Sequence, residues 1–369
     1  MGSCSLSSGP SSLPLEPSNP VFADCMLFAP SGTQRFSGVP HAPNRPTSDV
    51  DAVKIIGFQR PHDAEARLGV VSNRESTSDT QSDLDVFDLT DVVTGVVNPL
   101  DAMLFLQDNG LTALEGPLRH APRVEVTFEQ LLAPIAKPGK FLAIGYNYRR
   151  HASESGVEVA DYPLFFNKQV TCVSGPRSTI IYPRASAMLD YEGELAFVIA
   201  RRCHNVSIDD APRAIGAWMA CNDVSARDWQ RQSQSITLGK SYDSFGPIGP
   251  WLLTPDEVAD PHDLRITTTV NGVIRQDGST SDMIHNAFEQ IVALSARCTL
   301  EPGDIITTGS PAGSAQGQDP SPWLEPGDLV RVDVEHVGVL ENLVVVEDDE
   351  SFEGEHWSLA RGLAQGSSL

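Results

Sequence analysis

The sequence predicts an α+β fold dominated by β-structure, with a small β-rich N-terminal domain ahead of a larger domain. Short apolar runs of strand length recur between residues 53 and 346, whereas few segments have the length and spacing of a helix. Asn271-Gly272 lies between two strand-like runs, and this pair supplies the positive φ angles of a hairpin turn. With 40% apolar and 20% charged residues, the 369-residue chain has an ordinary globular composition.

Four consecutive regions are predicted. Residues 1–48 are rich in Ser, Pro and Gly and are expected to be a disordered or loosely attached leader. Residues 49–135 are predicted to form the small N-terminal domain, and 136–347 the main domain. The last residues, 348–369, are expected to be an acidic peripheral tail.

Each region has its own predicted elements. In the N-terminal domain we expect strands near 53–58, 68–71 and 86–89, a helix near 99–107, and a connector over 116–140. In the main domain we expect strands at 140–145 and 189–200, a hairpin at 266–274, a closing strand pair at 329–346, and helices at 208–219 and 282–296.

The charge of the chain limits its partners. A formal net charge of −23 argues against nucleic acid and anionic membrane surfaces, which attract basic faces. A small anionic substrate stays possible because a bound cation reverses the charge of one cleft. No apolar run is long enough for a transmembrane helix, and no signal peptide is expected. The six cysteines lack metal or disulfide spacing, which favours a reducing, cytoplasmic location.

Glu192 and Glu194 carry the clearest chemical signal. They lie two apart in a predicted strand, so their side chains are expected on one face. Two carboxylates this close repel each other unless a cation or a proton intervenes. Asp223 follows another apolar segment and can supply a third carboxylate. Oxygen ligands favour Mg²⁺ or Mn²⁺, with Ca²⁺ possible, although Glu pairs also occur on the exposed face of edge strands.

A series of motifs between residues 145 and 345 resembles the fumarylacetoacetate hydrolase superfamily. The motifs, in order, are Gly145-Tyr146-Asn147-Tyr148 with His151 and Glu154; Asp190-Tyr191-Glu192-Gly193-Glu194-Leu195; Asn222-Asp223 with Ser225-Ala226-Arg227-Asp228; Gly239-Lys240-Ser241 with Gly246-Pro247-Ile248-Gly249-Pro250; Leu300-Glu301-Pro302-Gly303-Asp304 with Thr308-Gly309-Ser310-Pro311-Ala312-Gly313; and Leu324-Glu325-Pro326-Gly327-Asp328. The resemblance implies a mixed β-roll catalytic domain, a homodimer, and Mg²⁺ or Mn²⁺ on Glu192, Glu194 and Asp223.

The same resemblance implies catalytic partners. His151 and Glu154 are three apart, on one face of a short helix, and match a dyad that activates water. A His-x-x-Glu pair in isolation is more often a surface pair. Lys240 matches a residue beside the metal that holds a substrate oxygen or stabilises an enolate; its alternative is a surface charge.

Four further residues are predicted to contact substrate: Tyr146, Arg227, Gln230 and Ser310. Arg227 has the alternative of pairing with a neighbouring aspartate. Serine stands at position 310 where the family usually has threonine, and it keeps the hydroxyl. After Gly313 the chain reads Ser314-Ala315-Gln316 in place of a small apolar residue and glycine, so the predicted loop departs from the family pattern.

These features favour a metal-dependent hydrolase that cleaves a carbon–carbon bond in an acylpyruvate or related 1,3-dicarbonyl oxo acid. His151, steered by Glu154, would take a proton from the attacking water, and the metal would act as a Lewis acid. The alternative within the family is a decarboxylase, a tautomerase or a hydratase of a 2-oxo acid, including one in secondary metabolism. The alternative of another class is a non-catalytic binding protein that retains the fold.

Overall fold

The structure, a computed structural model, describes residues 53–72, 83–159, 161–232 and 234–347. All of them belong to one compact unit, Pro46–Leu369. The predicted leader and acidic tail lie outside the described residues. Among the described residues, no helix combines the length and the apolar character needed to cross a membrane.

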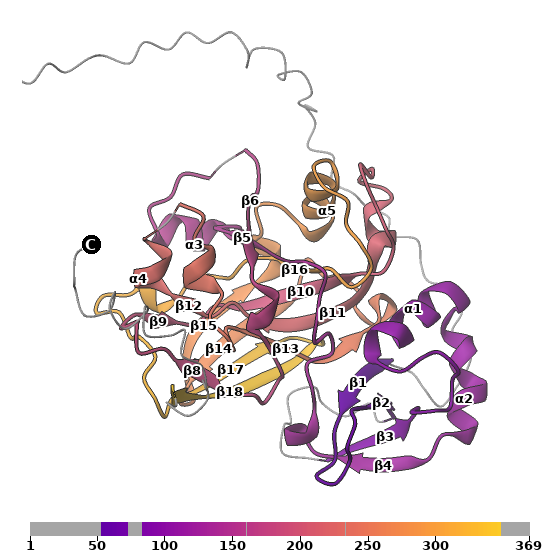
Figure 1. Ribbon diagram of the computed structural model, residues 1–369. Coiled ribbons are helices and arrows are strands. Elements are labelled where there is room, and N and C mark those ends of the chain that lie inside the picture. The colour runs from indigo at the N-terminus through magenta and orange to yellow at the C-terminus, as the bar shows by residue number, and fades with distance from the viewer. Residues whose placement is uncertain (1–52, 73–82, 160, 233, 348–369) are drawn as a thin grey trace, which may run out of the picture. The chain divides into compact units, whose positions relative to one another are not determined.

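The chain is mostly β-structure (Figure 1). Its strands are β1 (Lys54–Phe58), β2 (Arg67–Val71), β3 (Leu84–Asp88), β4 (Arg123–Val126), β5 (Phe141–Gly145), β6 (Leu164–Lys168), β7 (Val173–Ser174), β8 (Ile180–Tyr182), β9 (Leu189–Asp190), β10 (Gly193–Ile199), β11 (Ile215–Asn222), β12 (Ser225–Ala226), β13 (Gly246–Leu253), β14 (Arg265–Val270), β15 (Val273–Ser279), β16 (Ile305–Thr307), β17 (Leu329–Val334) and β18 (Gly338–Val346). Its helices are α1 (Pro99–Asn109), α2 (Glu115–His120), α3 (Arg149–Glu154), α4 (Arg227–Gln230) and α5 (Ala287–Ser295), with short 3₁₀ turns η2 (Leu111–Leu114), η3 (Phe128–Gln130), η4 (Val170–Cys172), η5 (Ala211–Ala214), η6 (Thr237–Lys240), η7 (Pro255–Glu257), η8 (Thr280–Asp282) and η9 (Ala315–Gly317). The predicted α+β, predominantly β fold class is confirmed.

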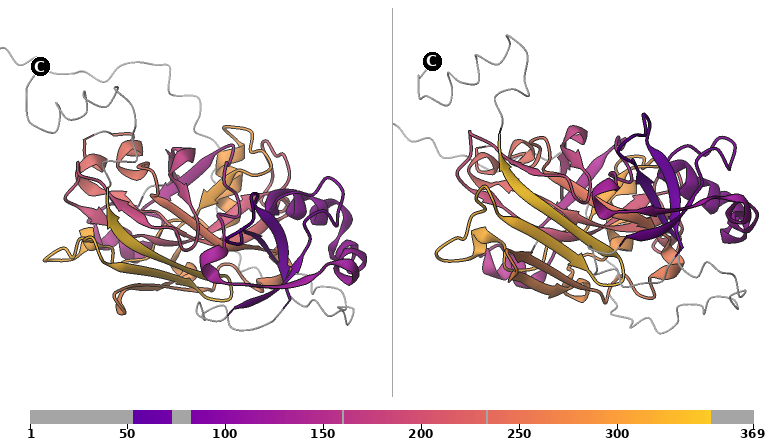
Figure 2. Two further views of the ribbon diagram at one scale, coloured as in Figure 1. Left: turned by 60° about the horizontal axis from the view of Figure 1, so that its bottom comes forward. Right: turned by 90° about the horizontal axis from the view of Figure 1, so that it is seen from below.

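The strands form two large sheets and one small one. The eleven-stranded sheet runs β4-β3-β2-β1-β13-β11-β10-β16-β5-β6, with β7 paired to β13. The five-stranded sheet runs β15-β14-β17-β18-β8, and Figure 2 shows β17 and β18 side by side in both views. The pair β9 and β12 forms the small sheet.

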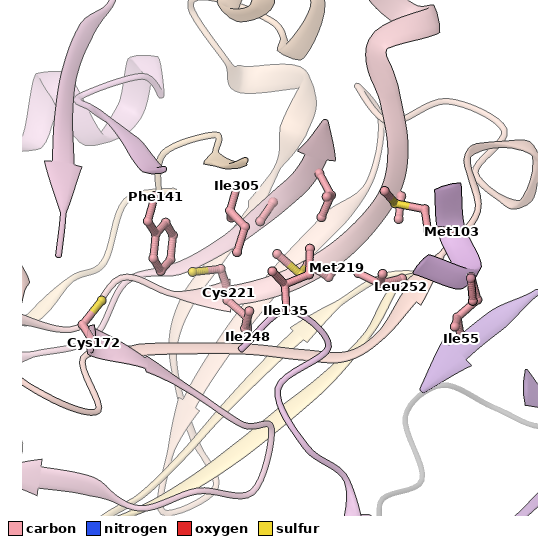
Figure 3. Packing of buried hydrophobic residues seen from close by; sticks show 14 of the residues in the cluster. Ile55, Met103, Ile135, Phe141, Cys172, Met219, Cys221, Ile248, Leu252 and Ile305 are labelled. Atoms are coloured by element: carbon pink, nitrogen blue, oxygen red, sulfur yellow. The ribbon is translucent and has the colours of Figure 1, made fainter. Parts of the chain in front are cut away.

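The N-terminal strands join the main sheet directly. β1 pairs antiparallel with β13, with Lys54 opposite Leu253. The core is continuous across this pairing, because Ile55 and Met103 belong to the same buried cluster as Met219 and Leu252 (Figure 3). The domain boundary expected between residues 135 and 136 stays a prediction.

Several predicted elements are confirmed. The three N-terminal strands and the helix at α1 lie where the periodicity placed them, and β17 and β18 form the closing pair. Asn271 (φ 52°) and Gly272 (φ 77°) turn the β14–β15 hairpin. The segment 116–140 was expected to be a connector, but it contains regular structure, namely α2, β4 and η3.

The helix predicted over 208–219 is wrong. Only a short turn, η5, forms there, and β11 follows it with every residue buried. β11 lies in the interior of the sheet between β10 and β13. A strand covered on both faces is apolar at every position, so it loses the alternation that distinguishes it from a helix.

Two other boundaries differ from prediction. The strand expected over 189–200 is interrupted between β9 and β10 at Tyr191 and Glu192, where Asp190 and Asn222 side chains accept the backbone N–H groups. The helix expected from 282 begins at Ala287, because the Asn286 side chain caps its first turn.

Candidate metal centre

Three carboxylates from neighbouring strands converge in the core. Glu192 immediately precedes β10, Glu194 lies in it, and Asp223 follows the antiparallel β11. The backbone N–H of Asp223 donates to the carbonyl of Glu192 at 2.8 Å, which joins the two segments. One oxygen of each carboxylate lies within 4.8 Å of the other two, and all three residues are buried. The structure thus brings the three predicted ligands together.

Gly193 separates the two glutamates, and the opposing sheet explains this glycine. A Cβ at this position would lie 2.2 Å from Oγ1 of Thr268 on β14 and 3.0 Å from Val332 on β17. A side chain would therefore force the two sheets apart. The Glu-Gly-Glu sequence follows from the close approach of the sheets behind the carboxylates.

Two buried lysines balance part of the negative charge. The Lys240 ammonium pairs with Glu192 and lies 2.6 Å from Oδ2 of Asp223. The Lys168 ammonium lies 2.6 Å from Oδ1 of Asp223 and donates to the backbone carbonyl of Lys240 at 2.5 Å. Lys240 is therefore a buried member of the cluster and not a surface charge.

Arg227 on α4 completes the cationic side. Its Nε lies 2.8 Å from Oδ2 of Asp190, and its Nη2 lies 2.6 Å from Oε1 of Glu192. Its Nη1 donates to Oε1 of Gln230 at 2.9 Å. Burial raises the pKa of Glu192, but Arg227 and Lys240 outweigh burial and hold that pKa below the usual range. Arg227 thus pairs with Asp190 and Glu192 and not with Asp223 or Asp228, the aspartates that follow β11.

Glu194 stands out among the carboxylates. Its Oε2 accepts from the backbone N–H of Gly309 at 3.0 Å, and no Lys, Arg or His nitrogen of the described residues forms an ion pair with it. Burial, together with the charges of Asp223 and Glu192, raises the pKa of its carboxyl well above the usual range. The charge of Lys240 lowers this pKa but does not offset burial and the two neighbouring carboxylates.

A divalent cation fits this donor set. Mg²⁺, Mn²⁺ and Ca²⁺ bind oxygens at about 2.0–2.6 Å, so two ligands of one ion lie at most roughly 5 Å apart. The spacing within 4.8 Å satisfies that limit, and all three donors are carboxylates. A cation beside Glu194 would also remove the repulsion that raises its pKa.

His151 and Glu154 lie on α3, whose helical spacing the sequence predicted. His151 Nδ1 is 3.7 Å from Oε2 of Glu154, and its Nε2 is 3.7 Å from Oε1 of Glu192. The imidazole is buried, and its Nδ1 has no hydrogen-bond partner. Both separations are longer than a hydrogen bond, so the ring lies between two carboxylates without being fixed to either.

The Glu154 carboxylate is also held by the backbone of Gly313. Its Oε2 accepts from the backbone N–H of Gly313 at 3.0 Å. Nearby His151 lowers the pKa of Glu154, burial opposes this, and the Gly313 hydrogen bond lowers it further, so the group stays ionised. A Cβ at Gly317 would lie 2.4 Å from the carboxyl carbon of Glu154. The carboxylate occupies space that only a glycine leaves free.

A cavity of about 440 Å³ opens beside the dyad. Tyr146, Glu154 and Gln230 line it, as do Arg231 and Gln316. Tyr146 has the left-handed backbone φ of 52°, uncommon outside glycine, and its ring stacks on His151 at 5.7 Å and 22°. The cavity adjoins the cluster through two links, Glu154 to His151 and Gln230 to Arg227.

Ser310 lies apart from the cavity wall. Its Oγ is buried and accepts from Nε2 of Gln276 at 2.6 Å. Oε1 of the same Gln276 accepts from the backbone N–H of Gly193 at 2.9 Å, so Gln276 ties the Ser310 loop to the Glu-Gly-Glu segment. The substrate contact expected of Ser310 stays a prediction.

The sequence did not identify Lys168, Asp190 or Gln276 as members of this region. Lys168 is one of only five lysines, and it ends a strand that begins with the apolar run Leu164-Phe165-Phe166. Asp190 is two residues before Glu192, so the alternation of side chains along a strand would place the two on the same face. Gln276 had no comparable signal, because its contacts depend on the packing of two sheets.

Comparison with known proteins agrees on one family. Residues 140–345 match the family described as fumarylacetoacetate (FAA) hydrolase, C-terminal. The Bos taurus protein named oxaloacetate tautomerase FAHD2A, mitochondrial, is 36% identical over 327 residues, covering 86% of this chain and 100% of that protein.

Two solved structures are similar over most of the chain. The fumarylacetoacetate hydrolase of Exiguobacterium antarcticum has a TM-score of 0.66 and 31% identity, covering 80% of this chain and 100% of that one. The maleylpyruvate hydrolase of Sphingobium sp. SYK-6 has a TM-score of 0.63 and 28% identity, with coverage of 80% and 100%.

Proposed function

We propose, from the premise that the chain belongs to the fumarylacetoacetate hydrolase family, that it is a divalent-metal-dependent enzyme that tautomerises a 2-oxo acid between its keto and enol forms. The observation that carries this proposal is the convergence of Glu192, Glu194 and Asp223 beside the unfixed imidazole of His151. The full-length similarity to a protein named oxaloacetate tautomerase supports the choice of reaction.

Glu192, Glu194 and Asp223 would hold Mg²⁺ or Mn²⁺, with Ca²⁺ as a third option. A bound divalent ion supplies a Lewis acid that polarises an oxo group and makes the neighbouring C–H more acidic. The chain's own cations cannot replace it at Glu194, which has no ion-pair partner of its own among the described residues.

His151 is the group that moves the proton. In the proposed reaction its imidazole takes a proton from the carbon next to the oxo group and then gives a proton to the oxo oxygen, which yields the enol and regenerates the neutral ring. Glu154 faces Nδ1 of His151 at 3.7 Å and orients the ring, so that Nε2 is directed at the carboxylate cluster. Lys240 has two of its three N–H donors directed at Glu192 and Asp223, so the third is free to hold the substrate oxygen.

Hydrolysis of a carbon–carbon bond, the reaction first favoured from the sequence, is the second candidate. The observation in its favour is the intact His151–Glu154 pair beside a cavity of about 440 Å³, which has room for an acylpyruvate and a water. In that reaction His151 takes a proton from water, the oxygen attacks the distal carbonyl, and the bond to the oxo-acid fragment breaks. A similar structure is named maleylpyruvate hydrolase.

One experiment separates the two reactions. The Mn²⁺-loaded protein is given enol-oxaloacetate, with loss of enol absorbance followed, and separately acetylpyruvate, with acetate and pyruvate measured. The proposal expects accelerated enol loss without net cleavage. Stoichiometric acetate would instead establish the hydrolase. Unchanged rates in both Glu192→Ala and His151→Ala would remove the site from either reaction.

A non-catalytic protein with this fold is the remaining alternative, and the joined cluster and dyad argue against it. Homodimer formation and a cytoplasmic location stay predictions. The bovine relative carries "mitochondrial" in its name, which argues for another compartment.

A further inference from the structure

We propose that Arg231 binds the second carboxylate of a dicarboxylic 2-oxo acid, which narrows the substrate class of the proposed function and rests on it. Arg231 was not among the residues singled out from the sequence. It lies directly after α4 and lines the cavity together with Glu154 and Gln316.

The positive side chains of the cluster already pair with carboxylates, whereas Arg231 does not. Arg227, Lys168 and Lys240 each pair with buried carboxylates of the cluster. Of the described residues that line the cavity, Arg231 is the one with a cationic side chain. Among the described residues its side chain has only neutral partners, Oε1 of Gln316 at 3.3 Å and Sδ of Met188 at 3.8 Å.

The position of Arg231 suits the far end of a substrate. Its backbone N–H donates to the carbonyl of Arg227 at 3.2 Å, so the two arginines are one helical turn apart on the same face. Arg227 reaches inward to Glu192, whereas Arg231 is exposed and lies about 6 Å further along the axis. A substrate whose oxo-acid end faces the carboxylate cluster therefore extends its other end toward Arg231.

The loop that departs from the family pattern positions this arginine. The backbone N–H groups of Ala315 and Gln316 donate to Asp190 at 2.7 and 3.1 Å, and Asp190 also pairs with Arg227. This anchor fixes the backbone of Gln316, whose side-chain amide accepts from Arg231. The unusual glutamine thus has a role in orienting the guanidinium.

An anion at this end of the cavity needs such a cation. Glu154 on the same wall is ionised, and the whole chain carries a net charge of −23. A distal carboxylate would be repelled without a local positive charge. The guanidinium offers a planar pair of N–H donors that matches a carboxylate.

The test compares two stable ligands that differ only at the far end. 2-Oxoglutarate carries a distal carboxylate, and 5-methyl-2-oxohexanoate carries an isopropyl group of the same shape. Binding of each to the Mn²⁺-loaded full-length protein is measured by calorimetry, so the result does not depend on turnover. The variants are Arg231→Met, Arg231→Lys and Gln316→Ala, with Arg213→Met as the control for loss of a surface arginine.

We expect Arg231→Met to weaken 2-oxoglutarate binding by about 10- to 100-fold and to leave 5-methyl-2-oxohexanoate within about twofold of wild type. Arg231→Lys should retain part of the preference, and Gln316→Ala should lose part of it. Equal affinity of the wild type for both ligands, or an equal loss of both in Arg231→Met, would overturn the proposal. The tautomerase and hydrolase assays stand apart from this outcome, because they fail or succeed with the wild type alone.

Discussion

Nε2 of His151 lies 3.7 Å from Oε1 of Glu192, a residue placed to bind a cation. In the proposed function, an imidazole this close to the carboxylate cluster can reach atoms of a ligand held at the cluster. His151 is not among the three grouped carboxylates, so the proposal predicts that metal binding and proton transfer can be separated by mutation.

His151→Asn should therefore abolish most turnover while leaving metal binding intact. Loss of a positioned general base lowers kcat by about 10²- to 10⁴-fold. Enol-oxaloacetate turnover and Mn²⁺ affinity are measured on the same preparation. A variant that loses Mn²⁺ affinity in step with kcat would show that His151 serves the metal instead.

Glu194→Gln should remove metal-dependent stabilisation without weakening the metal-free protein. The wild type should gain about 2.7 kcal/mol of stability at a Mn²⁺ concentration of 100 times Kd. Without metal, the amide relieves the repulsion that raises the pKa of Glu194, so its unfolding midpoint should equal or exceed that of wild type. Thermal unfolding with Mn²⁺ and with EDTA tests this, and the exposed Asp209→Asn serves as control.

Lys168→Met should destabilise the fold strongly. The change leaves Oδ1 of Asp223 and the carbonyl of Lys240 buried without their donor. Breaking one side of a buried ion pair costs about 3–5 kcal/mol. Urea unfolding followed by tryptophan fluorescence measures the change against Lys137→Met, an exposed lysine. A loss below about 1 kcal/mol would show that the cluster does not need this ammonium.

Gly317→Ala should impair activity more than stability. The added Cβ would meet the Glu154 carboxyl at 2.4 Å, and this flexible group can swing away. The dyad is then lost while the backbone is kept, so kcat should fall at least tenfold with less than about 1 kcal/mol of destabilisation. Gly116→Ala, with nothing within 4 Å of the new Cβ, is the matched control. Full activity in Gly317→Ala would show that the reaction does not need the Glu154 carboxylate in this position.

His262 should make the fold sensitive to mild acid. Its Nε2 accepts the backbone N–H of Ala287 at 3.3 Å, and burial lowers its pKa below 6.5 despite Asp260 and Glu289. As the pH falls through 6.5, the unfolded chain gains a proton that the folded chain does not, so stability falls.

His262→Gln keeps an acceptor for the helix and removes the titration. Its urea midpoint should decline less than that of wild type between about pH 6.5 and 5. Parallel declines in the two proteins would assign the acid sensitivity to other groups.

The sequence was sufficient for those parts of the site that depend on local spacing. Helical spacing paired His151 with Glu154, and the ordered motifs assigned Glu192, Glu194 and Asp223 to one site. The predicted continuous strand was nevertheless wrong at Glu192, since a side chain, Asn222, bonds its backbone N–H in place of a neighbouring strand. The three carboxylates still converge, because β10 and β11 pair in register with Gly193 opposite Asn222.

Other parts depended on contacts between distant segments, which no local pattern records. β11 was mistaken for a helix because burial on both faces removed its alternation. Gln276 could not be found, because its bond to Gly193 joins strands of different sheets and its bond to Ser310 reaches a loop far away in the sequence. Arg231 had no local signal, because its place on the cavity wall depends on segments far apart in the sequence, among them those of Glu154 and Gln316.

The residues of the carboxylate cluster also determine when the cluster can form during synthesis of the chain. Its hydrogen bonds join Lys168 to Asp223 and Lys240 to Glu192, and a last one ties Glu194 to the backbone of Gly309. During synthesis from the N-terminus, the complete coordination environment cannot exist until residue 309 has left the ribosome. In the proposed function, a metal ion that needs the complete cluster would therefore bind only after residue 309 has been synthesised and the distant segments have folded together.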